Sequence, residues 1–407
     1  MNAKDKEIVR ELAKRYLEIA SSEQQQKMNR RMKDTNDLKL VRPPVLLDEI
    51  PWYQMDIDGD LTCQCEDQGA RNVETFFRRA LFRHKYFRAD TVFEPFFRVT
   101  MAYDSTGIGL KTKEEVLSTE GENNVVSHSY EDLLENEEDV EKIQIPTFTP
   151  RPDKDEKAMA FYTELLGDAI PVKLCGLGTF YHTAWDHIVS LRGMEPVLYD
   201  LFDRPEHLHA IRQKLLDVAL AEMDFREKFI GNDPSYPTVH TTPAYVSWAE
   251  EGGLKQTWLR LNAQPFSEVS PDMHEEFDVD YALKIADRFG YTYYGCCEPL
   301  DRKLDVICKI PNLRKIGVSP WAKEEVMAEY MGGKYVYSRK PNPANVAIET
   351  NPEAIRKETE TTVKLCQKYG CPVEFILKDI STVSHRPQNL ILWANTVAEV
   401  LDQYYGE

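Results

Sequence analysis

Apolar runs and amphipathic segments alternate along most of this chain. From about residue 92 onward the runs are rich in β-branched and aromatic residues, and segments with helical 3–4 spacing lie between them. Most runs lack polar alternation, which is typical of strands buried on both faces of a parallel sheet. The predicted strands lie at 91–101, 170–178, 238–246, 256–266, 291–297, 313–319, 334–339 and 373–381.

The helical segments between these runs have recognisable ends. Many begin at a capping residue or a proline, as at Ser270–Pro271, and several end at a glycine. Repeated strand–helix alternation indicates an α/β protein with a parallel sheet, and about eight strands predict a (β/α)8 TIM barrel. No GxGxxG or GxxxxGK[ST] motif follows a predicted strand, so a nucleotide-binding sheet has no support.

Three regions of different character divide the chain. Residues 1–38 are predicted to form an N-terminal helical extension, because apolar Ile8, Leu12 and Tyr16 have 3–4 spacing among charges. Residues 39–407 are predicted to form the barrel, beginning with a strand inside 40–52. An acidic insertion at about 109–157 interrupts the strand–helix rhythm, and we expect it to be mostly exposed.

The charge balance narrows the classes of partner. The 407 residues include 50 Lys and Arg against 68 Asp and Glu, so the net charge is −18. Such a surface repels phosphate backbones and anionic lipids, which argues against nucleic acid and membranes as partners. The N-terminus lacks the apolar stretch of a signal peptide, and the pattern favours the cytoplasm, where the eight cysteines would stay reduced.

Polar residues at the carboxyl ends of the predicted strands form the candidate site, because the active sites of such barrels lie there. Thiols, imidazole and carboxylates together would suit zinc. Strand alternation predicts that only one of Cys296 and Cys297 faces the barrel interior. Both cysteines also fit a purely structural role, and that alternative stays open. The candidates are Cys296, Cys297, Glu298, Ser319, Trp321, Lys340, Asn342, Lys378, Asp379, Asn262, Gln264 and His240.

Several segments together resemble a known group of barrels. They are AWDHIVSLRGMEPVLYDLFDRPEHLH (184–209), FSEVSP (266–271), YYGCCEPLDRKLDVI (293–307), SRKPNPANVA (338–347) and HRPQNL (385–390). In order and spacing they resemble the uroporphyrinogen decarboxylase superfamily, and the chain is more similar to its cobalamin-dependent methyltransferases than to the decarboxylase. The decarboxylase has an arginine-rich motif where this chain has Asp48 and Glu49, which would repel a tetracarboxylate.

The resemblance implies roles for particular residues. The methyltransferases bind zinc through a His-x-Cys pair and a later cysteine; here Cys296 matches the first cysteine, Tyr294 the histidine and Asp379 approximately the later cysteine. It therefore implies a possible zinc site of Cys296, Glu298 and Asp379, with catalysis assigned to Tyr294, Lys378 and Asp379. Substrate binding would fall to Asn262, Gln264, Ser319, Lys340, Asn342 and His240.

The function that the resemblance implies is methyl transfer. The methyl group would move between a small methylated compound, of methoxy-aromatic or methylamine type, and a corrinoid (cobalamin) carried by a separate protein. A corrinoid-binding Asp-x-His-x-x-Gly motif is absent from this chain. Two alternatives stay open. One is a decarboxylase or other lyase acting on a small carboxylic acid, which Lys340 or Lys378 would bind, and the other is a non-catalytic ligand-binding barrel.

Overall fold

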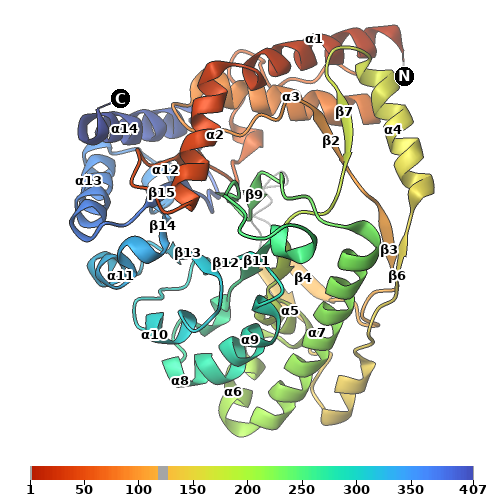
Figure 1. Ribbon diagram of the computed structural model, residues 1–407, viewed down its shortest axis with the longest axis vertical. Coiled ribbons are helices and arrows are strands. Elements are labelled where there is room, and N and C mark those ends of the chain that lie inside the picture. The colour runs from red at the N-terminus through yellow and green to blue at the C-terminus, as the bar shows by residue number, and fades with distance from the viewer. Residues whose placement is uncertain (1, 118–126, 407) are drawn as a thin grey trace.

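A parallel sheet of seven strands forms the centre of the molecule (Figure 1). The computed structural model describes residues 2–117 and 127–406. Every neighbouring pair of strands in the sheet is parallel, as predicted. In spatial order the strands are β1 (Val45–Leu47), β15 (Val373–Leu377), β14 (Val336–Arg339), β13 (Leu313–Val318), β12 (Tyr291–Tyr294), β11 (Trp258–Leu261) and β8 (Phe180–His182).

Helices cover the outer face of this sheet (Figure 1). The main core lies between the two layers, where Leu259, Ile316 and Phe375 of the strands pack with Trp393 and Val397. The helices that follow the central strands are α5 (Ala184–Arg192), α6 (Met194–Asp203), α7 (Pro205–Phe225), α8 (Pro271–His274), α9 (Asp280–Ala286), α10 (Leu304–Ile307), α11 (Glu324–Met331), α12 (Ala344–Ala347), α13 (Pro352–Tyr369) and α14 (Gln388–Tyr405).

The predicted α/β class with a parallel sheet is confirmed, but the strand inventory differs from the eight expected. Residues 238–246 form a small antiparallel hairpin, β9 (Thr238–Val239) and β10 (Thr242–Pro243), instead of a barrel strand. β2 (Phe97–Thr100) pairs with β7 (Val172–Cys175) in a separate sheet. β8 was not predicted, because the strand expected in this region was ended at residue 178, just before it. Among the described residues no strand pairing joins β8 to β1, so the sheet is barrel-like without a closed ladder.

The N-terminal segment consists of two helices. The side chain of Ser22 accepts a hydrogen bond from the backbone N–H of Gln25 and starts α2 (Glu23–Asn36) just after α1 (Ala3–Ala20). Leu12 and Tyr16 of α1 share a core with Phe77 and Leu166. These partners belong to α3 (Gln68–Tyr86) and α4 (Pro152–Leu166), so α1 packs against segments that we assigned to the barrel. The boundary at residue 38 stays a prediction.

One antiparallel strand pair lies within the acidic insertion, and another joins the segment before the insertion to its end. β3 (Tyr103–Ser105) pairs with β6 (Phe148–Pro150), and β4 (Glu114–Leu117) pairs with β5 (Ser127–Tyr130). Part of the predicted insertion, 118–126, lies outside the described residues, and its last residues already belong to α4. In the part of the chain that the structure describes, no helix is long and apolar enough to cross a membrane.

Candidate active site

The carboxyl ends of β12 and β15 meet although two strands separate them in the sheet. The Nζ of Lys378, directly after β15, lies 3.5 Å from the Sγ of Cys296 and 3.5 Å from the Sγ of Cys297, just after β12. In a flat sheet, strands three positions apart lie about 14 Å from one another. The contact therefore shows that the sheet curls, as a barrel does, and that its carboxyl end encloses these side chains.

Four side chains form what we call the thiol–lysine cluster: Cys296, Cys297, Lys378 and Asp379. The Nζ of Lys378 lies 2.7 Å from the Oδ2 of Asp379, and the Cys297 thiol donates to the same oxygen at 3.0 Å. The two sulfur atoms are 3.8 Å apart. Lys378 is 3% exposed, so its ammonium group obtains its charge compensation from the thiols and the carboxylate.

Both cysteines face the cluster, so the expectation that alternation would separate them is wrong. The strand ends at Tyr294, and Gly295 follows with a φ of 104°, which is unfavourable for a residue with a Cβ. A Cβ at Gly295 would also lie 2.8 Å from Leu300. The turn at this glycine redirects the chain, and the period-two rule no longer applies to the residues that follow.

The electrostatics of the cluster favour a thiolate at Cys296. The pKa of Cys296 lies well below its usual value, because the Cys297 thiol stabilises the anion and His240, Lys378 and Arg260 add to this against the effect of burial. The pKa of Cys297 is raised, because the Cys296 anion lies beside it. Burial lowers the pKa of Lys378, but the thiols and Asp379 outweigh it and raise the pKa overall.

His240 and Arg260 complete the surroundings of Cys296. His240 lies in the turn between β9 and β10 with a φ of 54°, and its backbone N–H donates to the hydroxyl of Tyr181 at 2.9 Å. Burial lowers the pKa of His240, and its side-chain interaction with Cys296 opposes part of that effect. The Arg260 guanidinium stacks over the Tyr293 ring at 4.8 Å. A neutral imidazole and a fixed cation thus adjoin the thiolate.

Glu298 holds the loop that carries the cysteines. Its Oε2 accepts the backbone N–H of Cys296 at 2.9 Å, and its Oε1 accepts that of Ala263 at 3.4 Å. The side chain is fully buried, and burial raises its pKa to about 7, with the negative charge of Cys296 adding to the effect. Glu298 therefore ties the β12 loop to the end of β11, and its carboxylate is engaged by the backbone.

Tyr294 lies outside the cluster and gives no support to the catalytic role that we expected of it. It is the last residue of β12 and faces the helix layer, where its hydroxyl donates to the Oδ2 of Asp278 at 2.6 Å. The Nε2 of His274 lies 2.5 Å from the same hydroxyl. Alternation along the strand explains the placement: Tyr293 faces inward over Arg260, so its neighbour faces outward.

Charged side chains continue below the cluster into the barrel interior. The Nζ of Lys340 donates to the Oγ of Ser338 at 2.6 Å, and that hydroxyl donates to Glu374 at 2.7 Å. Glu374 also pairs with the Nζ of Lys315 at 2.9 Å, and both are fully buried. The pKa of Lys340 is lowered to about 7, mainly because the side chain is buried; the charges of Lys378 and Lys315 add to this effect, and Glu374 opposes it. Lys340 is therefore able to exchange a proton near neutral pH.

The other predicted substrate residues differ in their placement. Asn262 is buried after β11 and donates to the Oδ2 of Asp186 at 3.0 Å, while its Oδ1 has no partner among the described residues. Ser319 is fully buried after β13. Gln264 is exposed, and the side chain of Asn342 accepts the backbone N–H of Ala344 at 3.0 Å. Asn262 and Ser319 line the end of the sheet, whereas Gln264 and Asn342 belong to its loops.

The predicted zinc ligands do not form a metal site. The Lys378 ammonium contacts both thiols and Asp379, and the Glu298 carboxylate accepts backbone N–H groups. Within residues 2–117 and 127–406, no three or more His, Cys, Asp or Glu side chains are grouped so as to hold a metal ion. These contacts engage the donor atoms that zinc would need, so the zinc site stays an expectation without support from this geometry.

Sequence reasoning missed three members of the site. Arg260 carried a signal, since it is the one charge in the apolar run WLRL of β11. Glu49 was noted only as a departure from the decarboxylase; its Oε2 accepts the backbone N–H of Asp379 at 2.7 Å. Asp186 lies in the first turn of α5, and burial raises its pKa. No sequence pattern around Asp186 indicates that it belongs to the site, because its place there depends on a tertiary contact with Asn262.

Comparison with known proteins bears on the fold. No protein-family model matches the chain, and no curated protein sequence matches it either. Among the solved structures that match is a methyltransferase from Methanosarcina mazei, with 12% identity and a TM-score of 0.52. The match covers 93% of this chain and 99% of that one. The two proteins share a fold over nearly their whole length.

Proposed function

We propose that this chain is a methyltransferase of the uroporphyrinogen decarboxylase superfamily, moving a methyl group from a small methylated compound to a corrinoid on a separate protein. The observation that carries the proposal is the thiol–lysine cluster at the carboxyl end of the strands. A thiolate is a strong nucleophile towards a methyl carbon, and the surroundings of Cys296 favour its thiolate form. A fold shared with a methyltransferase supports the same conclusion.

The chemistry balances with the residues present. The Cys296 thiolate attacks the methyl carbon, a sulfur–carbon bond forms, and the heteroatom departs with the bonding electron pair. Lys340, with a pKa of about 7, supplies a proton to that heteroatom and regains one from solvent. The sulfur–carbon bond would then break as the methyl group passes to the acceptor, a reduced corrinoid on a separate protein, and the electron pair of that bond would return to Cys296. Lys378 keeps the sulfur anionic before and after transfer.

The direct test is transfer to a reduced corrinoid. Purified protein is incubated with free reduced cobalamin and with methylamines, methanol or methoxy-aromatic compounds in turn, and methylcobalamin is followed by its absorption. We expect formation with one donor class and its loss in Cys296→Ser, while Cys308→Ser, away from the cluster, retains it. Equal activity in both variants would contradict the proposal. Insensitivity to a chelator is expected, because the proposed chemistry uses no metal ion bound by this chain.

A second candidate, decarboxylation of a small acid, is favoured by the charge of the barrel interior. Arg260, Lys340 and Lys378 are buried there alongside the Lys315–Glu374 pair, so cations outnumber carboxylates. Such an interior suits a carboxylate ligand. Release of carbon dioxide from small carboxylic acids, abolished by Lys340→Met and unaffected by Cys296→Ser, would favour the lyase over the methyltransferase.

A further inference from the structure

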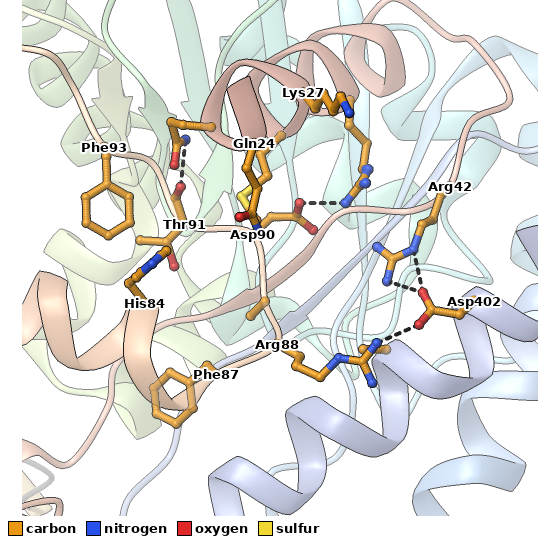
Figure 2. Close-up of a pocket in the computed structure, with 15 residues that line it drawn as sticks. Gln24, Lys27, Arg42, His84, Phe87, Arg88, Asp90, Thr91, Phe93 and Asp402 are labelled. Carbon is orange, nitrogen blue, oxygen red and sulfur yellow. Dashed lines mark hydrogen bonds and ion pairs between the residues drawn. The ribbon is translucent and has the colours of Figure 1, made fainter. Parts of the chain in front are cut away.

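A cavity lies at the opposite end of the sheet from the thiol–lysine cluster. It has a volume of about 450 Å³ and is lined by α2, the 87–91 segment after α3, and α14 (Figure 2). The backbone N–H of Val45 donates to the Oδ2 of Asp90 at 2.9 Å, and that of Asp90 donates to the Val45 carbonyl. Val45 is the first residue of β1, so this cavity adjoins the amino end of the strands.

The cavity, which we call the basic pocket, is rich in cationic side chains although the chain as a whole is negatively charged. Four permanently cationic side chains line it, Lys27, Arg31, Arg42 and Arg88, against the two carboxylates of Asp90 and Asp402. Lys27 and the half-exposed Arg88 bring positive charge to the open side of the pocket, in a protein whose net charge is −18. Positive charge on the lining of a cavity attracts and concentrates anions.

Two guanidinium groups share a single carboxylate in this pocket. Arg42 reaches Asp402 at 2.9 and 3.2 Å, and Arg88 reaches the other oxygen of Asp402 at 2.6 Å (Figure 2). The Arg88 side chain is 52% exposed, so part of its donor capacity faces the solvent. Lys27 is exposed on α2 and faces the same cavity. Guanidinium and ammonium groups arranged around an open cavity match the oxygens of a phosphate group.

We propose that the basic pocket binds a small molecule carrying two or more negative charges on phosphate groups. The bound anion connects Lys27 of α2 to Arg88 and, through Asp402 and Arg42, to α14. Gln25 already fixes α2 on the 87–91 segment by donating to the carbonyl of Thr91 at 2.9 Å. A ligand here therefore strengthens the attachment of the N-terminal helices to the barrel. This proposal is independent of the chemistry at Cys296.

Inorganic pyrophosphate is the probe that tests this site. Binding to the full chain is measured by calorimetry and by the melting temperature, with sodium chloride and sulfate at equal ionic strength as references. We expect a rise of several degrees with pyrophosphate beyond that with either reference salt. Lys27→Gln and Arg88→Gln should each weaken binding at least about tenfold, and Arg88→Lys should weaken it less, because the charge remains.

Arg356→Gln provides the matched control. Arg356 pairs with Glu399 of α14 at 3.0 Å but does not line the pocket, so its loss should leave pyrophosphate affinity unchanged. Equal affinity in the Lys27, Arg88 and Arg356 variants would overturn the proposal. A melting temperature that rises equally with sodium chloride would also overturn it, since general screening of an acidic protein gives that result. The affinities are compared among variants whose unliganded melting temperatures match that of the unmodified chain.

Discussion

The ammonium group of Lys378 and the thiol of Cys296 lie 3.5 Å apart in a buried site at the carboxyl end of the sheet. The resemblance led us to expect a metal ion as the positive charge beside this sulfur. In the structure a lysine supplies that charge, with Asp379 as its second partner at 2.7 Å. A cation next to a thiol favours the thiolate whether it is a metal or an ammonium group.

Removing this cation should make Cys296 less reactive. Lys378→Met should lower the rate of Cys296 alkylation by iodoacetamide at about pH 6.5 by at least about tenfold, because the thiolate loses its nearest positive charge. The rate is measured by mass spectrometry of the peptide containing Cys296. Lys364→Met, which removes an exposed lysine paired with Glu360, serves as the control. Equal rates in the two variants would show that Lys378 does not activate the thiol.

The buried Glu298 predicts a pH dependence of stability. Its pKa is about 7 in the folded protein, above the usual value of 4.5 for a glutamate. Between these values the folded state binds the proton more tightly, so the free energy of unfolding falls as pH rises through this window. The decrease amounts to roughly 3 kcal/mol, at about 1.4 kcal/mol for each pKa unit.

Urea unfolding of Glu298→Gln at pH values on either side of that window tests this. In this variant the free energy of unfolding should not fall as pH rises through the window, because the glutamine side chain has no titrating proton in that range. The control Glu329→Gln, on the exposed face of α11, should retain the fall. If the unmodified chain and Glu298→Gln respond identically to pH, the assigned pKa of Glu298 is wrong.

Tyr294 offers a test that separates stability from activity. Tyr294→Phe removes the hydroxyl that donates to buried Asp278. The Asp278 carboxylate then lacks this hydrogen bond while it stays buried, which should lower the free energy of unfolding by about 2 kcal/mol. Because the ring faces the helix layer, kcat should remain close to that of the unmodified chain. A large loss of kcat with unchanged stability would instead return Tyr294 to the reacting centre.

Much of the fold was accessible from the sequence, because strand periodicity and helix-end signals are local properties. The parallel order of β11 to β15 follows from the strand–helix rhythm. The hairpin at 238–246 was mistaken for a barrel strand, because its β-branched residues look the same in either setting. β8 was missed because the apolar run 170–178, which ends just before it, was taken as the strand of this region.

The sequence predicted which residues belong to the candidate site better than it predicted how they are arranged. The rule that active residues follow barrel strands selected Cys296, Cys297, Lys378, Asp379 and His240 before their proximity was known. It gave no information on the backbone turn at Gly295, which brings both thiols to one side. The engagement of Glu298 by backbone N–H groups depends equally on tertiary contacts that no local pattern records.

The most direct measurement is the mass of the Cys296 peptide after the protein meets a methyl donor without any acceptor. If Cys296 is the nucleophile, this peptide gains the mass of one methylene unit, and the gain disappears when reduced cobalamin is added. The gain should be absent in Lys378→Met at short times, because the thiolate is no longer stabilised. An unmodified Cys296 peptide with a donor that the enzyme demethylates would contradict the account.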